Sequence, residues 1–71
     1  MKPYEITVGC HLSERMERTL PGVRIENQPT GHALLITPPI DQAGLHGLLA
    51  RVRDLNVELV SVSRRQERSK G

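Results

Sequence analysis

Residues 41–55 read DQAGLHGLLARVRDL, and this stretch decides the fold. Its apolar side chains recur at the i, i+3, i+4, i+7 and i+10 positions of one helix face: Leu45, Leu48, Leu49, Val52 and Leu55. Asp41 is a good N-cap residue, and Asn56 suits the left-handed conformation that follows many helices. The sequence therefore predicts an amphipathic helix over about 42–54, with Leu48 and Val52 nearly fully buried.

Strand patterns surround this helix. Residues 4–12 and 23–27 alternate between two faces, which is typical of half-buried strands, and residues 57–63 are the predicted last strand. Residues 32–37 predict a third strand, whose run 33–36 is apolar on both faces and therefore favours a central position. Residues 28–31, with the sequence QPTG, predict the turn between the two middle strands.

A second, short helix is predicted between the first two strands. Ser13 is its expected N-cap, and Pro21-Gly22 ends it. The order strand, helix, strand, strand, helix, strand predicts an α+β fold of the ferredoxin-like β-α-β-β-α-β type. In this two-layer sandwich, a four-stranded antiparallel sheet has the short first helix and the longer second helix on one face.

The chain has 71 residues, enough for one small domain, which we assign to residues 1–63. Residues 64–71 are basic and contain no apolar side chain, so we expect a disordered tail there. The alternative is that the tail contacts a polyanion. RNA recognition by stacking is disfavoured, because Tyr4 is the only aromatic residue and falls on the core face of its strand. Nucleic acid is therefore an unlikely partner.

No segment resembles a signal peptide or a membrane span. Together with the single cysteine, this predicts a cytoplasmic protein without membrane contact. Cys10 lies on the apolar side of its strand, and we interpret it as a core residue.

Few residues are candidates for catalysis or for metal or ligand binding. The polar-site candidates are His11, His32 and His46, whose spacing matches no metal-binding motif. If the first and third strands pair, His11 and His32 would approach each other, while His46 lies at the boundary of the apolar helix face. Asp41 is interpreted as a helix cap, the alternative being a ligand site at the helix N-terminus. The sequence predicts no catalytic residues, no metal and no cofactor.

Two groups of residues are interface candidates. Ala43, Gly47 and Ala50 form a stripe of small residues on the polar side of the main helix, which is either a neutral surface or a packing face. Leu35, Val57 and Leu59 are expected on the uncovered sheet face, provided that Leu34, Ile36, Val60 and Val62 face the helices. We therefore expect a homodimer or another protein partner.

Residues 39–55 resemble a segment of a family of small uncharacterised bacterial proteins, in which the usual form is close to DQAALHGLLARIRDLG. The chain departs from that form at Gly44 and Asn56. The resemblance supports the fold and implies no activity. A weaker, partial likeness links residues 41–45 and 55–59 to half of an ACT domain, which would imply small-ligand sensing.

These observations together predict a non-catalytic interaction or regulatory module that acts by protein–protein contact or self-association. Nucleic-acid binding through the basic tail and ACT-like ligand sensing are the alternatives.

Overall fold

The computed structural model describes residues 1–65 and contains two helices and four strands. In chain order they are β1 (Tyr4–Val8), α1 (Glu14–Glu17), β2 (Arg24–Asn27), β3 (Ala33–Ile36), α2 (Gln42–Asp54) and β4 (Leu59–Arg64). The predicted α+β order is therefore confirmed, and it is consistent with a ferredoxin-like fold.

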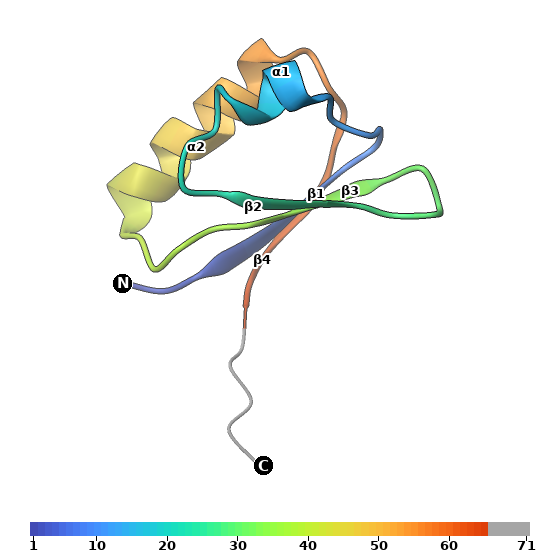
Figure 1. Ribbon diagram of the computed structural model, residues 1–71. Helices are drawn as coiled ribbons and strands as arrows, with labels where there is room; N and C mark the ends of the chain where they lie inside the picture. The colour runs from blue at the N-terminus through green and yellow to red at the C-terminus, as the bar shows by residue number, and fades with distance from the viewer. Residues whose placement is uncertain (66–71) are drawn as a thin grey trace.

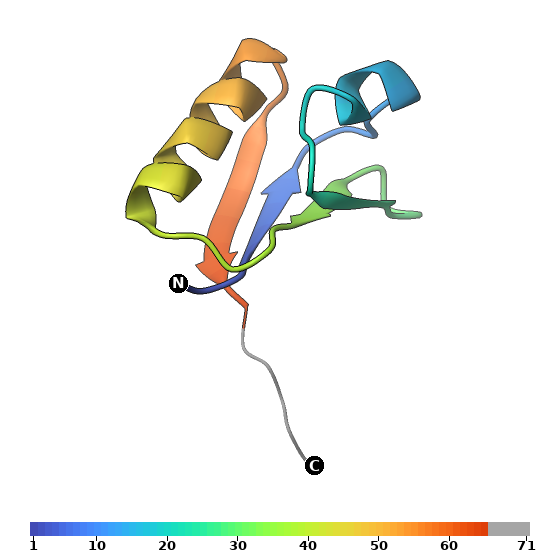
Figure 2. The ribbon, with the colours of Figure 1, turned by 60° about the vertical axis from the view of Figure 1, so that its left-hand side comes forward.

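The four strands form one antiparallel sheet in the order β2-β3-β1-β4. Both helices lie on the same face of the sheet, and the opposite face has no helix over it (Figure 1). In the view of Figure 2, α2 runs beside β4, whereas α1 lies toward the β2 side. The order leaves β2 and β4 as the two edge strands of the sheet.

The ends of the helices follow the sequence closely. The Ser13 hydroxyl accepts a hydrogen bond from the Met16 N–H at 3.3 Å, and α1 is a single turn. The Asp41 carboxylate accepts from the Gly44 N–H at 2.7 Å, so Asp41 caps α2 as predicted. Asn56 follows α2 with a φ of 61°, the left-handed conformation expected there.

The core is aliphatic and lies between the sheet and the helices. Its buried residues are Ile6, Val8, Leu12, Leu20, Ala33, Leu35, Leu45 and Val52. Val52 is buried as predicted, but Leu48 is only half-buried and Leu45 is buried instead.

The predicted orientation of β3 is wrong. Leu35 lies opposite Ile6 on the helix side of the sheet and is completely buried. Leu34 and Ile36 point to the uncovered face, where Leu34 lies opposite Thr7. A strand that is apolar on both faces carries no signal for its own orientation, so its pairing with β1 decides it.

The described part of the fold continues past the predicted domain boundary. Arg64 ends β4, and the Arg65 N–H donates to the Pro3 carbonyl at 2.9 Å. The Arg65 guanidinium also lies 3.2 Å from the Glu5 carboxylate. Arg64 therefore belongs to the sheet, and Arg65 is bound to the segment beside it rather than lying in a tail. The rest of the predicted tail, residues 66–71, lies outside the described residues.

Neither α1 nor α2 is long and apolar enough to cross a membrane, and these are the helices within residues 1–65.

Candidate functional site

β4 is an edge strand along which every residue is exposed. Leu59 and Val60 each have 48% of their surface exposed and Val62 has 36%. Within residues 1–65, the only other large apolar side chain exposed to this degree is that of Met1. Exposed apolar side chains therefore gather on a single strand, and contiguous apolar surface of this kind marks interaction sites.

The backbone of β4 also has unpaired hydrogen-bonding groups. Because Arg65 donates its N–H toward β1, the alternation of a strand directs the N–H and C=O of Val62 and Arg64 away from β1. No strand among the described residues lies on that side of β4. The outer edge of β4 is therefore a free template for another strand.

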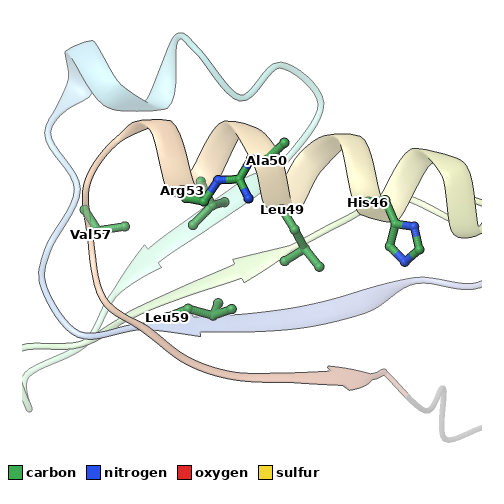
Figure 3. Close-up of a pocket in the computed structure, with 7 residues that line it drawn as sticks. His46, Leu49, Ala50, Arg53, Val57 and Leu59 are labelled. Carbon is green, nitrogen blue, oxygen red and sulfur yellow. The ribbon is translucent and has the colours of Figure 1, made fainter.

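A groove of about 460 Å³ lies between α2 and β4 (Figure 3). Its lining is mainly apolar and consists of His46, Leu49, Ala50, Val52, Arg53, Val57 and Leu59. Leu49 points from α2 toward the sheet, and Leu59 comes from β4 below it (Figure 3). The groove thus lies next to the outer edge of β4, on the face of the sheet that the helices cover.

A bulge at the start of β4 determines which way Leu59 and Val60 point. Thr7 pairs with Ser61, but Val8 pairs with Leu59, so Val60 is an extra residue in β4. This shift turns Leu59 toward the helix side, together with Val8.

Glu58 sits just before the bulge, on the uncovered face of the sheet. The Gly9 N–H donates to the Glu58 carbonyl at 2.8 Å. A Cβ atom at Gly9 would come within 2.7 Å of the Glu58 Oε1 atom and 3.3 Å of its Cβ. The absence of a side chain at position 9 therefore gives Glu58 its place over β1.

The structure brings together only some of the predicted interface residues. Ala50, Val57 and Leu59 line the α2–β4 groove with His46. The predicted location of Val57 and Leu59 on the uncovered sheet face is therefore wrong. Leu35, which is buried in the core, offers no contact surface.

The small-residue stripe does not form one packing face. Gly47 lines a different groove of about 260 Å³, on the α1 side of α2, together with Leu20, Pro21, Val23, Thr37, Pro38, Ile40, Gly44, Leu48 and Arg51. Ala43 is exposed. A Cβ atom at Gly47 would have no atom within 4 Å apart from its chain neighbours and the backbone of its own helix, so no close packing requires this glycine.

His32 lies at the turn between β2 and β3, and the ring of His11 reaches the same turn from the loop that follows β1. The Nε2 atom of His11 is 2.6 Å from the Gln28 carbonyl oxygen, and the Gln28 N–H donates to the His32 carbonyl at 2.8 Å. Both histidines are exposed. Across residues 1–65, no three His, Cys, Asp or Glu side chains are grouped so as to hold a metal ion.

The sequence reasoning missed Val60, Val62 and Arg53. Val60 and Val62 entered the prediction only as a condition, under which both face the helices and Val57 and Leu59 face away from them. The predicted topology could have identified this edge, because the last strand of a β-α-β-β-α-β fold pairs with the first strand alone and therefore lies at an edge of the sheet.

Comparison with curated proteins and with solved structures gave no match. One family model, described as a domain of unknown function (DUF8691), matches residues 3–63. The match spans β1 to α2 completely and all of β4 except Arg64. The expectation of a small uncharacterised family is thereby confirmed, and the chain belongs to the DUF8691 family.

Proposed function

We propose that this chain is a non-catalytic protein-interaction module that binds an extended polypeptide strand along the outer edge of β4. The observation that carries the proposal is the gathering of Leu59, Val60 and Val62 on an edge strand along which every residue is exposed. Strand addition to a free sheet edge is a common mode of protein recognition, in which main-chain hydrogen bonds supply affinity.

The α2–β4 groove would provide side-chain selectivity. Alternate side chains of an added strand point to the helix side of the sheet, where Leu49 and Leu59 offer apolar contacts. Arg53 is exposed at the same groove and would favour an acidic residue in the added strand. The expected ligand is therefore an extended segment with alternating apolar residues.

A cytoplasmic location in a bacterial cell is part of the proposal. Its supports are the free thiol of Cys10, which suits a reducing compartment, and the resemblance of residues 39–55 to a bacterial segment.

The proposal is testable with a fluorescent peptide that has the sequence of residues 57–65, VELVSVSRR. Its fluorescence anisotropy should rise as the protein is added. The Val62→Pro variant removes an outward N–H that β1 does not use, so the domain should fold but bind the peptide at least about tenfold more weakly.

Circular dichroism would establish that Val62→Pro is folded. Val60→Lys provides a second variant, because a lysine on an edge strand discourages strand pairing without altering the backbone. Equal binding by the wild type and both folded variants, or no binding by the wild type, would refute the proposed function.

A further inference from the structure

We infer that the strand received by β4 is β4 of a second copy of this chain, in an antiparallel pair whose two-fold axis passes midway between the two Val62 residues. This inference rests on the proposed function, because it requires the outer edge of β4 to accept a strand. It names both the partner and the register.

The first argument comes from the direction of the backbone groups. We call a residue of β4 outward-directed when its backbone N–H and C=O point away from β1. Opposite residues in an antiparallel pair either exchange hydrogen bonds or make none, so an outward-directed residue of one copy must lie opposite an outward-directed residue of the other. Val62 is outward-directed, whereas the backbone N–H and C=O groups of Ser61 and Ser63 point toward β1. A symmetric β4 pair must therefore be centred on one residue and not between two neighbours. Centring it near the middle of β4, on Ser61, Val62 or Ser63, keeps most of the strand paired, so these three residues are the candidates.

The second argument is charge complementarity. With Val62 at the centre, Ser61 lies opposite Ser63 of the second copy. If the bulge residue Val60 is counted as extra, Glu58 then lies opposite Arg65 of the second copy. Both residues direct backbone groups to β1, so their pairing obeys the rule above. The symmetry supplies this pair twice.

Glu58 and Arg65 also lie on the same face of the sheet. The Glu58 side chain adjoins Gly9, and the Arg65 side chain reaches Glu5, which is on the same face of β1 as Gly9. Centring on Ser61 instead places Glu58 opposite Ser63, and centring on Ser63 leaves Glu58 beyond the paired residues. Of the three registers, only the one centred on Val62 therefore places Glu58 of one copy opposite Arg65 of the other.

The Val62 register also covers the exposed apolar side chains. Val62 meets its own symmetry mate on the helix side, and Leu59 and Val60 lie opposite the aliphatic stem of Arg64 in the second copy. The resulting assembly is a continuous eight-stranded sheet, with the two α2–β4 grooves on either side of the seam.

Cysteine cross-linking tests the register. In a Cys10→Ser background, Ser61→Cys and Ser63→Cys are prepared separately and then mixed under mild oxidation. Residues 61 and 63 of opposite copies form a non-hydrogen-bonded pair about 4.5 Å apart between Cα atoms, within reach of a disulfide. Identical residues would be about 8 Å apart, which is too far. We expect cross-linked dimers only in the mixture.

Each alternative has a different result. Cross-linking of Ser61→Cys alone would establish the Ser61 register, and cross-linking of Ser63→Cys alone would establish the Ser63 register; either outcome overturns the inference. Peptide binding at the β4 edge without cross-linking in any sample would also overturn it while the proposed function stands.

Charge reversal gives an independent measurement by sedimentation velocity. Glu58→Lys places like charges opposite each other twice per dimer and should weaken association by about tenfold. The double variant Glu58→Lys/Arg65→Glu should restore association, whereas Glu58→Lys/Arg64→Glu should not. Equal restoration by both double variants would refute the Glu58–Arg65 pairing.

Discussion

Ile6 of β1 lies directly opposite Leu35 of β3, and neither side chain is exposed to solvent. The same row continues to Ile25 of β2, which is half-buried, and to Val62 of β4, which is 36% exposed. The row crosses the whole sheet, from a partly covered edge through the core to an open edge. Along this row, hydrophobic burial is therefore complete in the two central strands and incomplete at both edges, most of all at β4.

Truncation of Leu35 tests the orientation of β3. Leu35→Ala should lower the free energy of unfolding by about 2–5 kcal/mol, because it leaves a cavity beside Ile6. The neighbouring Leu34→Ala is the matched control and should cost clearly less, since Leu34 lies on the uncovered face. Urea denaturation of both variants measures the difference. Equal losses would contradict the assigned faces.

Local signals in the sequence predicted most of the fold. The apolar spacing and the cap at Asp41 determine α2, whose observed bounds are the predicted ones. The left-handed Asn56 and the turn at residues 28–31, in which the Gly31 N–H bonds to the Gln28 carbonyl, also followed from residue type. Each of these features depends on contacts between residues near in sequence.

The errors concern contacts between distant residues. Residues 33–36 are apolar on both faces, so only the register with β1 orients Leu35. The location of Leu59 depends on a bulge, which inverts the alternation within β4. Its trace in the sequence is the adjacent pair Leu59-Val60, where the alternation of apolar and polar residues changes phase.

The candidate site was accordingly predicted in part. Its groove residues Ala50, Val57 and Leu59 were among the interface candidates, but the surface that unites them was not. That surface is the open edge of β4, which exists only once the strands have been placed in order.

Removal of the cap at Asp41 should destabilise α2. Asp41→Ala loses the 2.7 Å hydrogen bond to the Gly44 N–H and should lower the free energy of unfolding by about 1 kcal/mol. Asp41→Asn keeps an oxygen acceptor and should remain close to the wild type. Thermal melts followed by circular dichroism compare the three proteins. An Asn variant as unstable as the Ala variant would mean that charge, rather than capping, is what position 41 supplies.

Deletion of residues 66–71 should leave stability unchanged. Those residues contain no apolar side chain, and the contacts of Arg65 with Pro3 and Glu5 are retained when the chain ends at residue 65. We expect the melting temperature to change by less than about 2 °C. A fall of about 5 °C or more would mean that the deleted residues stabilise the domain.

Thr37 is the only buried polar residue in the described chain, at 3% exposure, and its hydroxyl group joins β1 to the end of β3. The hydroxyl oxygen accepts from the Tyr4 N–H at 2.9 Å, and the hydroxyl O–H donates to the Pro38 carbonyl at 2.8 Å. Thr37→Val keeps the shape of the side chain but leaves the Tyr4 N–H without an acceptor, so it should cost about 1–3 kcal/mol. Thr37→Ser keeps the hydroxyl and loses one methyl group, worth about 0.8 kcal/mol. Chemical denaturation should therefore rank the wild type above the Ser variant and the Ser variant above the Val variant. The reverse order of the two variants would show that the methyl group, and not the hydrogen bond, is what this position contributes to stability.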